Sequence, residues 1–224
     1  MIDKRLVIVT GHYGSGKTEF SVNYAIKMKE KCEKVSIADL DIVNPYFRTR
    51  EKRKFLEELG IDVSDSSIRN TTLDLPALPA EIMGIIQNQN VKAVLDVGGD
   101  PVGARVLARF STLILNTEFD LFYVINAYRP ETNSKEKVIK YLRDIEKTSG
   151  LKVTGLINNT HLLKETKVHD VEFGHELTKE VSWETDIPIR YEVAIQNVVQ
   201  DIVNPEIKDK LFPINLYMRE EWMS

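Results

Sequence analysis

The stretch Gly11-His12-Tyr13-Gly14-Ser15-Gly16-Lys17-Thr18 lies near the start of this 224-residue chain. It matches the pattern Gly-x-x-x-x-Gly-Lys-[Ser/Thr] at every fixed position. An apolar run, residues 5–10, precedes it, and a helical pattern, residues 19–31, follows it. Glycines let the backbone wrap closely round an anion, and loop N–H groups together with the helix N-terminus point at phosphate oxygens. This strand–loop–helix context predicts a loop that binds a nucleoside triphosphate.

Individual residues of the loop have separate expected roles. Lys17 reaches the terminal phosphates, and the Thr18 hydroxyl is a ligand for Mg²⁺. Glu19 opens the helix and is counted among the expected nucleotide contacts. His12 lies inside the loop, where it either contacts a phosphate or a partner or merely fills the loop.

Composition limits the class of protein. The length suits a single α/β domain, residues 1–224. A net charge of -4 gives no electrostatic reason to expect binding to nucleic acid or to an anionic membrane. The single cysteine, Cys32, cannot form an internal disulfide, which fits a reducing compartment. With no signal-peptide pattern, no bilayer-spanning run and no basic amphipathic tail to anchor it, we expect a cytoplasmic protein.

Two further strands are expected to end in carboxylates beside the loop. Residues 34–38 lead to Asp39 and Asp41, and either of these can hold a water on Mg²⁺ while the other orients or deprotonates an attacking water. Residues 91–95 lead to Asp96, expected to bind Mg²⁺ through water. Gly99, three residues later, can offer its N–H to a γ-phosphate, which would make residues 97–103 a switch. The plainer alternative is that both are polar strand ends before turns.

Residues at a later strand end bear on the choice of base. The strand 151–157 runs into Asn158, Asn159, Thr160 and His161, where guanine-specific GTPases usually place Asn-Lys-x-Asp. No aspartate stands there to accept from guanine, whereas an asparagine amide can pair with an adenine edge. The sequence therefore favours ATP over GTP. Arg48, in a charged run, either contacts phosphates or lies on the solvated face of a helix, and the second is favoured.

Strands and helices alternate along the chain, which predicts an α/β fold: a doubly wound, mostly parallel sheet with helices on both faces. Residues 61–78 are expected to carry little regular structure, residues 112–115 to form a short strand, and residues 187–193 to be the last strand. His169 and His175 are six apart on a predicted helix and are expected to be solvated rather than to share a metal ion.

Taken together, these motifs resemble the MinD/ParA-type P-loop ATPases of the SIMIBI class, over roughly residues 5–200. That group also includes the nucleotide-binding domains of cobyrinate amide synthases and dethiobiotin synthases, with the UreG/HypB nickel-enzyme GTPases as cousins. The resemblance implies residues 14–18 on the phosphates, Thr18 and Asp39 at Mg²⁺, Asp41 as the water-activating residue and Asp96 as the Walker B acid.

The sequence departs from that pattern at His12, where many MinD/ParA members carry a second lysine that reaches across a dimer. Either His12 or Arg48 supplies charge to a partner subunit, or hydrolysis does not depend on such a dimer. We expect a Mg²⁺-dependent ATP-binding protein with slow ATPase activity, acting as a nucleotide switch for a protein partner and forming a homodimer. An ATP-dependent small-molecule kinase or amide-forming synthase and a GTPase metallochaperone of the UreG/HypB type are the alternatives.

Overall fold

The computed structural model describes residues 3–40, 52–65, 78–99 and 101–218. Within these ranges one sheet has eight strands in the order β3-β2-β4-β1-β5-β6-β7-β8, and every pairing is parallel. The strands are β1 (Leu6–Gly11), β2 (Val35–Asp39), β3 (Ile61–Asp65), β4 (Lys92–Asp96), β5 (Phe119–Ile125), β6 (Gly155–Asn158), β7 (Ile189–Ile195) and β8 (Leu211–Ile214). The predicted parallel sheet is confirmed.

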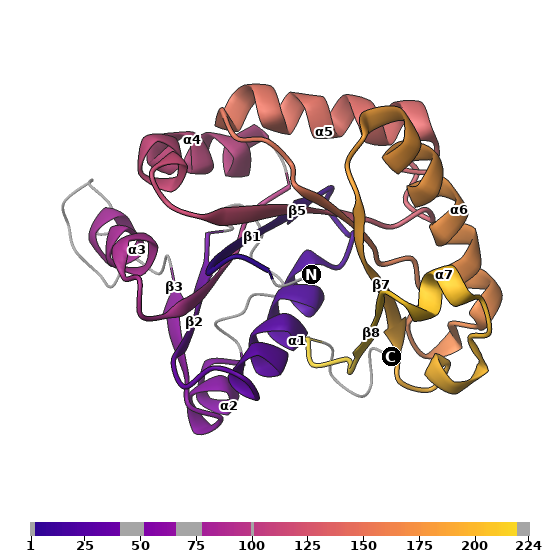
Figure 1. Cartoon of the computed structure of the whole chain (residues 1–224), viewed down its shortest axis with the longest axis horizontal. Coiled ribbons are helices and arrows are strands. Elements are labelled where there is room, and N and C mark those ends of the chain that lie inside the picture. The colour runs from indigo at the N-terminus through magenta and orange to yellow at the C-terminus, as the bar shows by residue number, and fades with distance from the viewer. Residues whose placement is uncertain (1–2, 41–51, 66–77, 100, 219–224) are drawn as a thin grey trace.

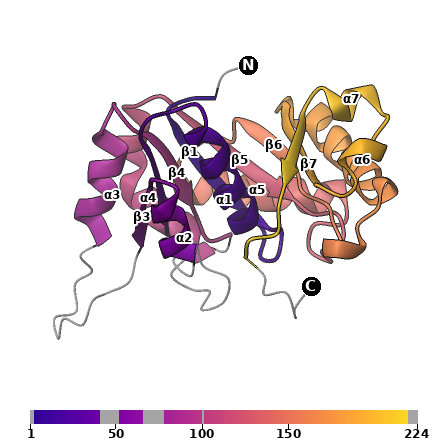
Figure 2. The ribbon, with the colours of Figure 1, turned by 90° about the horizontal axis from the view of Figure 1, so that it is seen from below.

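Helices cover both faces of this sheet (Figure 1). They are α1 (Lys17–Lys29), α2 (Arg53–Glu58), α3 (Leu78–Gln87), α4 (Pro101–Leu115), α5 (Lys135–Ser149), α6 (Val168–Thr185) and α7 (Pro205–Lys208). Helices α1 and α2 lie on one face, and α3, α4 and α5 lie on the other. Figure 2 shows α3 near one end of the sheet and α6 with α7 at the opposite end. The fold is therefore doubly wound, as the sequence predicts.

The first strand shows why its sequence is apolar throughout. Leu6 and Ile8 point into the core under α3, α4 and α5, whereas Val7 and Val9 point into the core under α1 and α2. Successive side chains of a strand face opposite sides, so a strand covered on both faces needs apolar residues at every position. This packing fixes the end of β1, and with it the start of the loop at residue 12.

Strand order brings the expected carboxylates together. Strand β4 lies between β1 and β2, with Val9 opposite Asp96 and Asp96 opposite Asp39. All three strands are parallel, so their carboxyl ends meet at one edge of the sheet. Ligands of open α/β sheets bind outside this edge.

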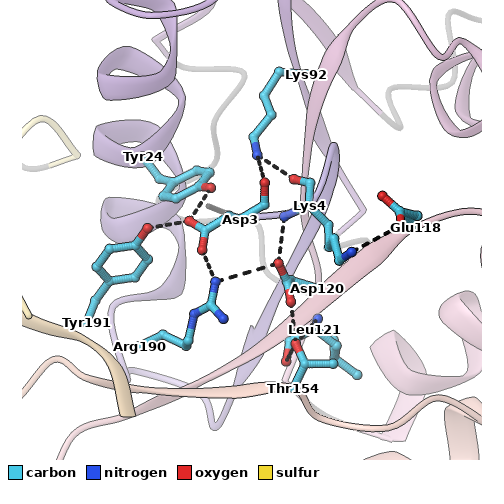
Figure 3. A network of polar contacts seen from close by, with 10 residues as sticks. All are labelled: Asp3, Lys4, Tyr24, Lys92, Glu118, Asp120, Leu121, Thr154, Arg190 and Tyr191. Atoms are coloured by element: carbon cyan, nitrogen blue, oxygen red, sulfur yellow. Dashed lines mark hydrogen bonds and ion pairs between the residues drawn. The ribbon is translucent and has the colours of Figure 1, made fainter. Parts of the chain in front are cut away.

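A buried polar network closes the opposite edge of the sheet (Figure 3). The carboxylate of Asp3 accepts hydrogen bonds from the hydroxyls of Tyr24 and Tyr191 and pairs with the guanidinium of Arg190. Only 4% of the Asp3 side chain and 11% of the Arg190 side chain are exposed. Because the partners come from α1 and β7, the network joins the N-terminal segment to both the first helix and a distant strand.

Three expected elements differ from the structure. Residues 61–65 form the edge strand β3, in which Ile61 and Val63 are buried beside β2. Residues 112–115 continue α4, because Leu107, Phe110 and Ile114 recur at helical spacing on its buried face. Strand β7 is not the last, since β8 pairs with it at the edge, where Pro213 is tolerated.

In the described ranges, no helix combines the length and the apolar character that crossing a bilayer requires.

Candidate nucleotide-binding site

The loop between β1 and α1 has a strongly curved backbone. Gly14 and Gly16 have φ angles of 75° and 83°, in the left-handed region that favours glycine. The N–H of Ser15 donates to the carbonyl oxygen of His12 at 3.1 Å, and the N–H of Phe20 donates to that of Gly16 at 3.0 Å. The loop thus folds back on itself and passes directly into the first turn of α1.

Two side chains from other strand ends hold this loop. The amide Nδ2 of Asn159 donates to the carbonyl oxygen of Ser15 at 2.8 Å, and Nε of Arg129 donates to that of Gly14 at 2.8 Å. A Cβ at Gly16 would come within 2.3 Å of Asn159 Nδ2, so glycine is required there for space as well as for its φ angle. These two hydrogen bonds hold the carbonyl oxygens of Gly14 and Ser15 toward the strand ends that follow β5 and β6.

A cavity of about 210 Å³ opens beside the loop and the start of α1. It is lined by Tyr13, Gly14, Gly16, Lys17, Thr18, Glu19, Arg129, His161, Leu163 and Met218. Most of the expected phosphate-binding residues therefore face one hollow, together with residues that follow β5 and β6.

Two buried carboxylates stand at the carboxyl ends of the neighbouring strands. Asp39 is 2% exposed and Asp96 is 1% exposed, and they are direct neighbours across β2 and β4. The Ser21 hydroxyl donates to Asp96 Oδ1 at 3.3 Å, which ties this carboxylate to the first turns of α1, where Thr18 also lies. Carboxylate and hydroxyl oxygens are the ligands that Mg²⁺ prefers. Among the described residues, no three His, Cys, Asp or Glu side chains converge as a metal cage.

The segment after β4 packs directly on the phosphate loop. A Cβ at Gly99 would lie 1.5 Å from the carbonyl oxygen of Gly11, a distance that no side chain allows. Glycine at position 99 therefore lets the two backbones touch.

Two expected nucleotide contacts, Glu19 and His12, have side chains that bond to or pack on other parts of the chain. The carboxylate of Glu19 accepts the backbone N–H groups of Tyr217 (2.6 Å) and Met218 (3.1 Å), which fastens the C-terminal segment to α1. The His12 ring packs edge-on against Tyr141 of α5, 4.6 Å between centroids. Asp41 and Arg48 lie outside the described residues.

Asn158 and Asn159 are adjacent but serve different parts of the molecule. Asn158 Nδ2 donates to Glu192 Oε2 at 2.8 Å and to the carbonyl oxygen of Val171 at 3.0 Å, so its amide faces β7 and α6 rather than the cavity. Glu192 also pairs with His175, 2.7 Å from Oε1 to Nδ1. His175 is 1% exposed, and the expectation that it is solvated was wrong. His169 on the same helix is 70% exposed.

Sequence reasoning missed Arg129 and Met218. Arg129 follows the apolar strand β5 by four residues, a position at the carboxyl edge that the same strand-end argument applied to Asp39 and Asp96 would have selected. Met218 had no such signal, because its place at the cavity depends on the bonds from the C-terminal segment to Glu19.

No family model matches the sequence, and no curated protein matches it. Solved structures are similar to it. The signal recognition particle receptor FtsY from Elizabethkingia anophelis is 16% identical with a TM-score of 0.56, over 83% of this chain and 57% of that one. Chloroplast FtsY from Physcomitrella patens is 16% identical with a TM-score of 0.57, over 85% and 58%. FlhF complexed with GTP/Mg(2+) is 16% identical with a TM-score of 0.53, over 84% and 64%.

This chain thus spans less than two thirds of each of these three proteins. At 16% identity the likeness is one of fold. The chain shares the parallel α/β fold of these FtsY and FlhF structures.

Proposed function

We propose that this chain is a Mg²⁺-dependent ATP-binding protein with slow ATPase activity, which works as a nucleotide switch for a partner. One observation carries the proposal: a glycine-shaped loop at the start of α1 adjoins two buried carboxylates from the ends of neighbouring strands. Loop N–H groups and a helix N-terminus suit phosphate, and paired carboxylates suit the cation that accompanies it.

The residues present fit Mg²⁺. Thr18, Asp39 and Asp96 would hold it, the carboxylates through water, and the ion would neutralise charge on the phosphates. Lys17, 6% exposed at the cavity wall, adds a second positive charge. Two carboxylates rather than a closed cage support an ion that arrives with the nucleotide and keeps several of its waters.

Hydrolysis requires a group that orients the attacking water. We assign this role to Asp41, two residues beyond Asp39, which would take the proton of the water as its oxygen bonds to the γ-phosphorus. The bond from that phosphorus to the β–γ bridging oxygen would break, and ADP would leave with the negative charge on its β-phosphate. A single carboxylate is a weak base for water, which supports slow turnover.

The contact between Gly99 and Gly11 supports a switch. A γ-phosphate that accepts from the Gly99 N–H would hold the segment after β4 in one position, and its loss would release that segment. The finer resemblance to MinD/ParA-type ATPases belongs to this proposal, with a second copy of the chain as the first candidate partner and another protein or a small-molecule substrate as alternatives.

The preference for adenine over guanine rests on the end of β6, where residues 158–161 include no aspartate. Guanine needs an acceptor for its N1–H and amino group, and the carboxylate that lines the cavity, that of Glu19, is already bonded to two backbone N–H groups. Within the described ranges Asn159 Oδ1 is buried without a hydrogen-bond partner. An amide oxygen can accept from the adenine amino group and from the N–H groups of guanine alike, so this atom does not separate the two bases. FlhF was solved with GTP, so guanine is the competing outcome to test.

Binding and competition measurements test the proposal. Mg²⁺-ADP should bind wild-type protein and raise its melting temperature, because a ligand of the folded state stabilises by mass action. Lys17→Ala should weaken binding of Mg²⁺-ATP or abolish turnover, while the control Lys140→Ala, an exposed lysine on α5, should not. In competition with a fluorescent nucleotide, ATP should displace it at lower concentration than GTP. A clear GTP preference would contradict the base assignment, and no binding of either would contradict the function.

A further inference from the structure

The turn that follows β5 holds one arginine in a fixed position. The N–H of Arg129 donates to the carbonyl oxygen of Asn126 at 3.1 Å, and its own carbonyl oxygen accepts from the N–H of Thr132 at 2.9 Å. The Thr132 hydroxyl donates to the Asn126 carbonyl oxygen at 2.8 Å, and Asn126 Oδ1 accepts from the N–H of Tyr128 at 3.0 Å. The backbone on both sides of Arg129 is therefore bonded within the turn.

The guanidinium of Arg129 lies against the phosphate loop. Its Nε is 2.8 Å from the Gly14 carbonyl oxygen, and a Cβ at Gly14 would come within 3.3 Å of Cζ. A guanidinium has five N–H donors, and this bond uses one. No carboxylate pairs with Arg129 among the residues that the structure describes.

The surroundings of Arg129 favour an anion. Arg129 and Lys17 line the same cavity of about 210 Å³, and the carboxylate there, Glu19, is bonded to the backbone of the C-terminal segment. His161 also lines it, and its Nδ1 accepts from the Leu163 N–H at 3.2 Å, which leaves Nε2 as the donor of a neutral ring. The wall therefore offers positive charge and donors.

The cavity also indicates which part of a nucleotide Arg129 meets. It is lined by Gly16, Lys17, Thr18 and Glu19 and by residues that follow β6, whereas Asp39, Asp96 and Gly99, expected on the γ-phosphate side, do not line it. We propose that Arg129 is a phosphate-binding residue that contacts the phosphates shared by nucleoside di- and triphosphates. This inference rests on the proposed function. Arg129 would supply, within the same chain, positive charge at a loop that has His12 where many MinD/ParA-type proteins carry a second lysine.

Substitution with a matched control tests the inference. Arg129→Gln keeps a hydrogen-bond donor but removes the charge, and Arg109→Gln, on the exposed face of α4, is the control. Charge-assisted hydrogen bonds to phosphate predict that Arg129→Gln weakens Mg²⁺-ADP and Mg²⁺-ATP by the same factor, roughly 10- to 100-fold. In competition with fluorescent ADP, the affinity of the variant for pyrophosphate should fall by the same factor. Its affinity for adenosine should equal that of the wild type.

Each other pattern overturns the inference. If Arg129→Gln binds both nucleotides as tightly as wild type, Arg129 does not contact the phosphates. If only ATP binds more weakly, the contact is with the γ-phosphate. If adenosine also binds more weakly, the contact is with the nucleoside. If Arg129→Gln does not fold, Arg129→Lys replaces it. The lysine ammonium carries its three donors on one atom and cannot reproduce the planar fork, which presents separate N–H groups to the Gly14 carbonyl oxygen and to a phosphate. Several-fold weaker ADP binding is therefore expected, and wild-type affinity would overturn the inference. Wild-type protein that binds no Mg²⁺-ADP would instead defeat the proposed function itself.

Discussion

The side-chain amide of Asn159 donates to the carbonyl oxygen of Ser15 at 2.8 Å, which joins two points 144 residues apart in the sequence. Both residues are fully buried. The end of β6 therefore supports the phosphate loop from behind, and Gly16 packs on the same amide. The shape of the loop thus depends on a residue that is remote in sequence.

Replacing that residue should weaken nucleotide binding. Asn159→Ala leaves the buried Ser15 carbonyl oxygen without its donor, which costs about 1–3 kcal/mol. We expect the free energy of unfolding to fall by that amount and the affinity for Mg²⁺-ADP to fall roughly tenfold. Urea denaturation and calorimetric titration measure the two. Asn90→Ala, an exposed asparagine at the other edge of the sheet, should change neither. Unaltered ADP affinity in Asn159→Ala would show that the loop holds its shape without this bond.

Gly99→Ala should separate the loop from the segment after β4. The new methyl group would lie 1.5 Å from the Gly11 carbonyl oxygen, so one backbone must move. We expect the free energy of unfolding of Gly99→Ala to be lower than that of the wild type. We also expect the variant to bind the nucleoside diphosphate and the triphosphate with equal affinity. Gly84→Ala provides the control, because a Cβ there meets nothing within 4 Å and Gly84 lies inside α3. In a helix this change should be neutral or stabilising by about 0.5–1 kcal/mol. Titrations of both variants with ADP and a non-hydrolysable triphosphate distinguish them.

His175 should make stability depend on pH. Its hydrogen bond to Glu192 raises the pKa of the imidazole above its usual 6.5, against the effect of burial, and Glu206, Lys179 and Glu176 also face or adjoin it. A raised pKa in the folded state means that the stabilisation is fully present below about pH 6.5 and is lost as pH rises through the folded pKa.

The free energy of unfolding of the wild type should therefore fall between pH 6 and pH 8.5 by more than that of His175→Asn. The same substitution at His169, which is exposed on the same helix, should leave the wild-type pH dependence intact. Identical profiles for wild type and His175→Asn would refute the charged pair.

Asp3→Asn should destabilise the edge of the sheet that lies opposite the loop. Burial alone would raise the pKa of Asp3, but hydrogen bonds from Tyr191, Tyr24 and Arg190 outweigh it and lower the pKa. The substitution removes the nearer of two carboxylates that pair with the largely buried Arg190, the other being that of Asp120 at 3.9 Å, and a loss of up to about 3–5 kcal/mol is expected in urea denaturation. Because the folded pKa is lowered, the contribution of Asp3 is present above about pH 4 and disappears as pH falls through the folded pKa. Glu118→Gln, whose ion pair with Lys4 is exposed, should have little effect.

Local patterns predicted most of the sheet and the two carboxylates at its edge. The apolar runs that end in Asp39 and Asp96 predict buried strands, because a strand covered on both faces needs apolar residues throughout. The first charged residue after each run marks the end of the strand. The edge strand β3 alternates apolar and polar residues, and β8 has four residues of which one is proline, so the identity of both strands depends on pairing with β2 and β7. A local sequence pattern does not predict which strands pair at the edges of a sheet.

Side-chain directions at the site were harder to predict than its location. Asn158 and Asn159 are equivalent in the sequence, yet the first faces α6 and the second holds the loop. Which one turns inward depends on Glu192 and on helix α6, both contributed by later parts of the chain. The direction of the Arg129 side chain was equally hard to predict, because its partner is the Gly14 carbonyl oxygen, 115 residues away in the sequence.

Crystals grown with Mn²⁺, which replaces Mg²⁺ and gives an anomalous signal, and a non-hydrolysable ATP analogue test the central claim most directly. We predict phosphate density inside the loop of residues 11–18, with an anomalous peak bonded to the Thr18 hydroxyl and reached through water by Asp39 and Asp96. An empty loop in crystals soaked at millimolar nucleotide, or an anomalous peak remote from both carboxylates, would contradict the account.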